Sequence, residues 1–116
     1  MQNIHNIHTE ATQAARNAVG AFLEDWNTKT GGNQYGEPMY CGFAWVDVAV
    51  TRTNSKEAKL LESIGFKPSW RPKQMQLWDP ADYRGQSMDC KEVGARAYAE
   101  VLQKHGFKAY MGSRAD

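Results

Sequence analysis

Ile64-Gly65-Phe66-Lys67 and His105-Gly106-Phe107-Lys108 carry the same short pattern, and the order of helices and strands can be predicted from these two stretches. Each follows a segment with the apolar spacing of a helix and precedes a segment that alternates like a strand. The glycine can adopt the left-handed conformation that closes a helix, and the phenylalanine after it can pack back on the last helical turn. The chain is therefore predicted to contain two equivalent junctions from helix to strand.

The first junction belongs to a strand, a helix and a hairpin. Phe43 to Val50 alternates side chains as a strand does, and we expect Asn54 to cap the helix that follows. Two short β-like segments, 66–70 and 75–79, then form a predicted hairpin. Because Pro68 cannot donate a ladder hydrogen bond, its strand is expected at a sheet edge.

The second junction belongs to a longer helix. Ser87 is expected to cap this helix, His105 lies in its last turn, and Gly106 ends it. A final strand is predicted over residues 107–111. Residues 43 to 111 then have the order strand, helix, strand, strand, helix, strand. This order predicts a ferredoxin-like βαββαβ sandwich, an α+β fold with a four-stranded antiparallel sheet.

The predicted sheet has one apolar face and one mixed face. The two helices should cover an apolar face formed by Ala44, Val46, Val48, Val50, Met75, Leu77, Phe107, Ala109 and Met111. The opposite face should carry aromatic and polar side chains, namely Trp45, Asp47, Gln76, Trp78, Lys108 and Tyr110. Since an exposed patch of this kind usually marks an interaction site, we expect a cover: the N-terminal helix, a second subunit or a ligand. We favour the helix.

The 116 residues are predicted to form a single domain, 1–116. Within it we expect a disordered segment at 1–8, an N-terminal amphipathic helix at 9–29, a loop rich in Gly, Asn and Pro at 30–42, and the βαββαβ core at 43–116. The chain is long enough to bury a core without metal or disulfides.

Composition and charge narrow the class of protein. With 41% apolar residues, 23% charged residues and a net charge of +1, the chain has an ordinary globular composition and lacks the basic excess of a typical nucleic-acid binder. No apolar run suggests a signal segment or a membrane span, so we expect a cytoplasmic protein. Cys41 and Cys90 have no partner at metal-ligand spacing and are expected to be buried thiols.

Asp47 is the carboxylate that the pattern places inside the sheet. Burial beside Trp45 would raise its pKa, as in a general acid, unless a cation such as Lys108 or Arg114 pairs with it. The pattern places no Ser, Cys or His beside Asp47 as a nucleophile. We therefore favour a structural ion pair beneath the N-terminal helix over a catalytic role.

The turn of the predicted hairpin is the most basic and aromatic segment. Trp70 lies beside Arg71 and Lys73 in the sequence, and an indole next to cations can stack on a nucleic-acid base. Charged residues on an edge hairpin also discourage the addition of another strand, and that interpretation needs no ligand. We favour the second interpretation.

Motifs for metal, cofactor or catalysis are missing from the sequence. His5, His8 and Glu10 could bring three ligating groups together, but at a chain end we expect no metal site. There is no Gly-rich phosphate loop and no HExxH, GxSxG or CxxC motif, so no catalytic residue and no cofactor is predicted.

Several short segments and single residues of the sequence resemble those of small uncharacterised proteins of tailed bacteriophages. They are Cys41-Gly42-Phe43-Ala44-Trp45-Val46, Gln86-Ser87, Ala95, Ala97, Ala99, Val101-Leu102, Gly106 and Ser113-Arg114-Ala115-Asp116. The resemblance covers about residues 39 to 116 and carries no assigned site residues. It implies expression from a phage genome in the cytoplasm of a bacterial host, where many small phage proteins bind and inhibit host proteins.

Three functions are compatible with these features. The leading hypothesis is a non-enzymatic phage accessory protein, monomer or homodimer, that binds a host protein or complex and inhibits an antiviral defence system such as a CRISPR complex. Its expected binding residues are Trp45, Asp47, Trp70, Arg71, Lys73, Trp78, Lys108, Tyr110 and Arg114. One alternative is a single-strand or RNA-binding module that uses the sheet face and the hairpin. The other is a small enzyme acting on a phosphate or nucleotide, for which Arg114, Asp47 and Ser113 would have to converge.

Overall fold

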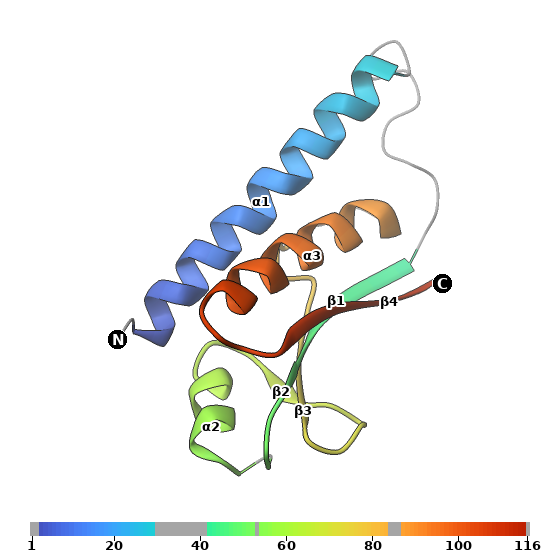
Figure 1. Cartoon of the computed structure of the whole chain (residues 1–116). Coiled ribbons are helices and arrows are strands. Elements are labelled where there is room, and N and C mark those ends of the chain that lie inside the picture. The colour runs from blue at the N-terminus through green and yellow to red at the C-terminus, as the bar shows by residue number, and fades with distance from the viewer. Residues whose placement is uncertain (1–2, 30–41, 53, 84–86, 116) are drawn as a thin grey trace.

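The computed structural model describes residues 3–29, 42–52, 54–83 and 87–115. Within them the elements follow in the order α1 (Ile4–Lys29), β1 (Gly42–Ala49), α2 (Lys56–Glu62), β2 (Lys67–Pro68), β3 (Gln74–Trp78), α3 (Met88–Lys104) and β4 (Ala109–Ala115) (Figure 1). The α+β class is confirmed. The predicted loop falls largely outside the described residues, as does Cys41, whereas Gly42 already belongs to β1.

The strands form one four-stranded sheet in the order β2-β3-β1-β4, and each neighbouring pair is antiparallel. β1 lies in the centre and pairs on one side with β3 and on the other with β4. The short strand β2 lies at an edge, where Pro68 needs no ladder hydrogen bond from its nitrogen, as predicted.

Both helix-to-strand junctions are confirmed. Gly65 has a φ of 108°, and the N–H of Phe66 donates a hydrogen bond of 3.1 Å to the carbonyl oxygen of Leu61. Gly106 has a φ of 92°, and the N–H of Phe107 makes the equivalent hydrogen bond at 3.0 Å. A glycine with positive φ thus lets the chain turn out of each helix while the next amide still satisfies a carbonyl of the last turn.

One predicted helix cap is wrong and the other is confirmed. The residue that caps α2 is Ser55, whose hydroxyl accepts a hydrogen bond of 3.2 Å from the N–H of Ala58. Asn54 lies one residue too early to reach that amide. Ser87 caps α3 in the same way, with its hydroxyl 3.3 Å from the nitrogen of Cys90.

The last strand differs from the prediction. β4 begins at Ala109 rather than Phe107, because Phe107 is occupied in closing α3, and it continues to Ala115. Its ladder with β1 runs from the pair Val48 and Ala109 to the pair Gly42 and Ala115. The residues from Gly112 onward are small or polar, so apolar alternation could not show that they belong to a strand.

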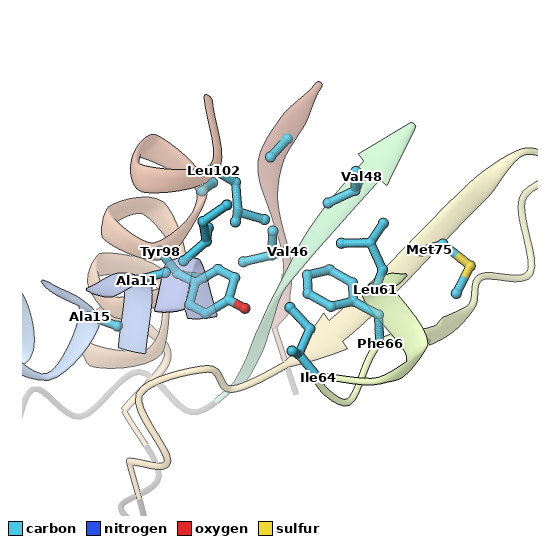
Figure 2. Packing of buried hydrophobic residues seen from close by; sticks show 14 of the residues in the cluster. Ala11, Ala15, Val46, Val48, Leu61, Ile64, Phe66, Met75, Tyr98 and Leu102 are labelled. Atoms are coloured by element: carbon cyan, nitrogen blue, oxygen red, sulfur yellow. The ribbon is translucent and has the colours of Figure 1, made fainter. Parts of the chain in front are cut away.

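The core lies between one face of the sheet and the helices α2 and α3. Figure 2 shows Val46 and Val48 of β1 on the side of the sheet where Leu61 of α2 and Tyr98 and Leu102 of α3 lie. All five side chains are fully buried. The predicted apolar face is confirmed: its other members are buried or partly buried against this cluster, as is the free thiol of Cys90.

The N-terminal segment is ordered over most of the range predicted to be disordered. α1 begins at Ile4, and the side chains of Ile4 and Ile7 are buried, with 8% and 6% exposed. These isoleucines continue the apolar stripe of Ala11 and Ala15 by one turn, which gives the segment a surface to bury. Residues 1 and 2 lie outside the described residues.

α1 packs against α3 and not on the open face of the sheet, so the predicted cover is wrong (Figure 1). The physical reason is the fit between small residues: Ala11 and Ala15 are fully buried, and a Cβ added at Gly94 of α3 would lie 3.1 Å from Val19 of α1. A stripe of alanines is best satisfied by a helix that can approach closely. None of the described helices combines the length and apolar character needed to cross a membrane.

Candidate functional site

The face of the sheet opposite α2 and α3 carries a cluster of aromatic side chains. We call this surface the aromatic face and define it by Phe43 and Trp45 of β1, Trp78 of β3, Tyr110 of β4 and Trp70 of the β2–β3 hairpin. The exposed fractions are 80% for Trp70, 46% for Trp78 and 41% for Tyr110. Because exposed apolar surface gathered in one place is typical of interaction sites, we take this face as the candidate site.

Two tryptophans form the centre of the aromatic face. Trp45 and Trp78 are a direct cross-strand pair, and their rings stack with centroids 4.9 Å apart at an angle of 24°. Phe43 adds a tilted ring 5.7 Å from that of Trp78. On the other side, Trp45 lies over Gly112, where an added Cβ would be 2.5 Å from the indole nitrogen. The two stacked indoles therefore rest on three neighbouring strands, β3, β1 and β4.

A chain of polar contacts orients both indoles. Nε1 of Trp45 donates a hydrogen bond of 3.0 Å to Oδ2 of Asp47, and Nε1 of Trp78 donates one of 2.8 Å to Oε1 of Gln76. Gln76 in turn lies with Nε2 3.5 Å from Oδ1 of Asp47. Because both indole N–H groups are occupied, what the two tryptophans offer a ligand is ring surface.

Asp47 is buried in this face with 6% of its surface exposed. Desolvation raises its pKa, and the hydrogen bond from Trp45, the charge of Arg71 and the contact with Gln76 oppose that shift. The predicted ion pair with Lys108 or Arg114 beneath α1 is wrong. The hydrogen-bond partners among the described residues are Trp45 and Gln76, and α1 lies elsewhere.

Cations flank the aromatic face on two sides. The guanidinium of Arg71 lies 5.0 Å from the ring centre of Trp70. On the opposite side, Nζ of Lys91 and the guanidinium of Arg114 lie 5.1 and 5.9 Å from the ring centre of Phe43. Arg71 and Arg114 are exposed and can meet a partner's charges, whereas Lys91 is half-buried and bonds the carbonyl oxygen of Gly42.

A groove of about 530 Å³ runs across this surface. It brings together seven of the predicted site residues: Trp45, Asp47, Trp70, Arg71, Trp78, Tyr110 and Arg114. The structure does not bring Lys73 or Lys108 into it. Lys73 is exposed in the hairpin turn with a φ of 62°, and Lys108 lines a separate hollow with Val50 and Glu57.

Three further residues shape the groove without having been predicted as site residues. Gln76 links Asp47 to Trp78, and Gly112 makes room for the indole of Trp45. The ring of Phe43 packs against Trp78, and the cations of Lys91 and Arg114 lie over it. The position of Gln76 on the mixed face was a usable signal, whereas Gly112 could be found only by extending the last strand beyond Met111.

The groove contains two serines, and neither is bonded to Asp47. Ser113 donates its hydroxyl hydrogen bond to Glu92 of α3, and the hydroxyl of Ser69 accepts one of 3.2 Å from the N–H of Arg71. Asp47, Ser113 and Arg114 thus line one groove without forming a nucleophile and base pair.

Two of the three candidate metal ligands in the N-terminal segment, His8 and Glu10, bond other side chains. Nδ1 of His8 lies 2.8 Å from the hydroxyl of Tyr98, and the carboxylate of Glu10 bonds Lys104 and His105 at 2.8 and 2.9 Å. Among the residues that the structure describes, no group of three or more His, Cys, Asp or Glu side chains could hold a metal ion.

Comparison of the chain with protein-family models, curated proteins and solved structures finds no match. Its function must therefore be inferred from the aromatic face.

Proposed function

We propose that this chain is a non-enzymatic binding protein that docks another protein on its aromatic face. The observation that carries the proposal is the exposure of Trp70, Trp78 and Tyr110 on one groove-bearing side of the sheet. Tryptophan, tyrosine and arginine contribute most of the binding energy in protein interfaces, and they do so from the centre of the contact.

The charge of the face indicates what its partner carries. Arg71 and Arg114 present positive charge on either side of the stacked indoles, while the carboxylate of Asp47 is buried and bonded. Complementary surfaces pair opposite charges, so the partner should offer apolar side chains flanked by Asp or Glu.

The biological setting of the proposal rests on the resemblance to small phage proteins. The segments Cys41–Val46 and Ser113–Asp116 include Phe43 and Trp45 of the aromatic face and Arg114, which lies over Phe43. Part of what resembles the phage group therefore lies at the proposed binding surface. We propose that the partner is a protein of a bacterial host, and that binding blocks a complex of its antiviral defence in the cytoplasm.

We also propose that the architecture is the ferredoxin-like βαββαβ sandwich with α1 added to its helical side. Three observations support this: the sheet order β2-β3-β1-β4, the antiparallel pairing of all neighbours, and a helix in each of the connections β1–β2 and β3–β4.

The test is affinity capture from bacterial lysate with three forms of the chain. The wild type is compared with Trp70→Ala/Trp78→Ala, which removes exposed ring surface, and with Leu60→Ala. Leu60 is 44% exposed on α2 and serves as a matched control for the loss of an exposed apolar side chain. We expect one host protein to be retained by the wild type and by Leu60→Ala and to be lost from the double variant.

Two results would overturn the proposal. The first is equal retention of the same host proteins by all three forms, and the second is retention of none by the wild type. A circular dichroism spectrum confirms that each variant is folded, and a reconstituted defence assay with the purified partner then tests inhibition.

A second candidate function is the binding of single-stranded nucleic acid. The observation that favours it is Arg71 placed against Trp70, since stacking on an aromatic ring combined with a nearby cation is how such strands are held. The test is fluorescence anisotropy with a labelled oligonucleotide at several salt concentrations. Binding should weaken steeply with salt if phosphates are contacted, and an affinity independent of salt excludes this function.

A further inference from the structure

Among the described residues, no strand pairs with the outer side of β4. The N–H of Ala49 donates a hydrogen bond of 3.0 Å to the carbonyl oxygen of Lys108, and hydrogen-bonded pairs alternate along an antiparallel ladder. The even-numbered residues of β4 therefore bond β1. The odd-numbered residues Met111, Ser113 and Ala115 turn their N–H and C=O groups away from the sheet.

The two edges of the sheet differ in how they are protected. β2 spans two residues and contains Pro68, both of which discourage another strand from pairing there. β4 spans seven residues and contains no proline. At its beginning, Nε2 of Gln103 donates a hydrogen bond of 2.6 Å to the carbonyl oxygen of Ala109, and no side chain among the described residues is seen to do the same for Met111 or Ser113.

We propose that a second copy of this chain pairs with β4, antiparallel and about a two-fold axis at Gly112. Met111 then exchanges backbone hydrogen bonds with the partner's Ser113, and Ser113 with the partner's Met111. The two four-stranded sheets join into one continuous sheet of eight strands, in which the β4 edge of each copy is paired and a short β2 strand lies at either end.

Side chains on the open face favour a second copy over an unrelated strand. In this register Tyr110 lies opposite the partner's Arg114, and Arg114 lies opposite the partner's Tyr110. Within one chain the Tyr110 hydroxyl accepts a hydrogen bond from Gln74 and Arg114 lies over Phe43. On dimer formation the two side chains turn toward the seam, and the two-fold axis then creates two pairs of a cation and an aromatic ring. A shift of two residues in one direction sets Arg114 opposite the partner's Lys108, which places like charges together. The opposite shift sets Arg114 against the partner's Gly112, which offers no ring.

The pairing also extends the candidate site. Tyr110, Gly112 and Arg114 line the groove on the side of β4, which is the edge of a single chain. In the dimer the partner's Tyr110 and the partner's Arg114 continue that wall across the seam. Two aromatic faces then lie on the same side of one sheet, and the partner copy contributes residues to each groove.

The first test is the molar mass of the chain in solution, measured by light scattering during size exclusion. We expect twice the 13.1 kDa of one chain for the wild type. Ser113→Pro removes an outward N–H that β1 does not use, so it should yield a folded monomer. Ser113→Ala loses the same hydroxyl and keeps the N–H, so it should remain a dimer.

The second test fixes the register. Tyr110→Cys and Arg114→Cys are prepared separately in a Cys41→Ser background, with Cys90 left in the core. Mild oxidation should give a disulfide-linked dimer in high yield from a mixture of the two proteins and a much lower yield from either alone, because each substituted position faces the other across the axis.

Three outcomes contradict the inference. The first is a wild-type chain that remains monomeric at high concentration. The second is a Ser113→Pro variant that folds and is still a dimer. If Ser113→Pro does not fold, the cysteine pair decides: cross-linking that is as efficient in the single variants as in the mixture rules out the two-fold pairing of β4.

Discussion

The indole nitrogen of Trp45 donates a hydrogen bond of 3.0 Å to the carboxylate of Asp47, two residues further along the central strand. Asp47→Ala removes the buried acceptor of this part-buried N–H, and a hydrogen bond to a charged group contributes about 1.5–3 kcal/mol. We expect Asp47→Ala to lower the free energy of unfolding by about that amount, measured by urea denaturation at pH 7. Asp47→Asn keeps an oxygen acceptor and should lose less. Equal stability of wild type and Asp47→Ala would contradict a structural role for this hydrogen bond.

The same carboxylate makes stability depend on pH. Desolvation raises the pKa of Asp47 in the folded state above the value of about 3.9 of an unfolded chain. The folded state therefore binds the proton more tightly, and the resulting stabilisation is full below the unfolded pKa and is lost as pH rises through the folded pKa. We expect the wild type to gain stability relative to Asp47→Asn as the pH falls from 7 to about 4. A difference between the two proteins that does not change with pH excludes this linkage.

Substitution by alanine should lower the stability of the fold at Gly106 and raise it at Gly20. Gly106 has a φ of 92° and no atom within 4 Å of an added Cβ, so Gly106→Ala costs only backbone strain, about 1–2 kcal/mol. Gly20 lies inside α1 with equally open surroundings, and Gly20→Ala should stabilise by about 0.5–1 kcal/mol. Thermal unfolding of both variants checks the pair. A stabilising Gly106→Ala would mean that the junction does not need a positive φ.

Much of the sheet and its two junctions could be predicted because they depend on local chemistry. A glycine that closes a helix, a proline in a short strand and an alternating central strand each act over a few residues, and Gly65, Gly106 and Pro68 lie where those rules place them. The mixed composition of the open face followed from the same alternation, which put Trp45 and Trp78 on one side.

What could not be predicted depends on contacts distant in sequence. The alanine stripe of α1 indicated an apolar side but not the surface that it meets, and Gly94 of α3 gives that surface its shape. The cation whose charge opposes the raised pKa of Asp47 is Arg71 of the hairpin. Lys108, which was expected to pair with Asp47, lies before the last strand begins. The places of Arg71 and Lys108 relative to Asp47 depend on where the neighbouring strands end. Apolar patterns locate strand ends poorly where residues are small or polar.

Gly112 is predicted to be essential for the stacked tryptophans. A Cβ at this position would lie 2.5 Å from the indole nitrogen of Trp45, so Gly112→Ala must displace the ring. We expect a loss of about 1–3 kcal/mol in stability and a weaker stack with Trp78, visible as a change in near-ultraviolet circular dichroism. Trp45→Phe in the Gly112→Ala background should recover part of the stability because the smaller ring needs less room. No spectral change in Gly112→Ala would show that the indole does not rest on β4.

The docking of α1 on α3 should weaken in mild acid because of His8. Its ring nitrogen Nδ1 lies 2.8 Å from the buried hydroxyl of Tyr98, and desolvation followed by the charge of His5 lowers the pKa of His8. A lowered pKa means that the folded state favours neutral His8, so its contribution to stability is present above the unfolded pKa of about 6.5 and is lost as pH falls through the folded pKa. We expect the free energy of unfolding to decline from pH 7 to about 5 in the wild type and to decline less in His8→Gln, which keeps a hydrogen-bonding group but does not titrate. Glu10 has a lowered pKa and loses its contribution only at more acidic pH, which separates the two effects. An equal decline in both proteins would show that His8 does not control the docking of α1.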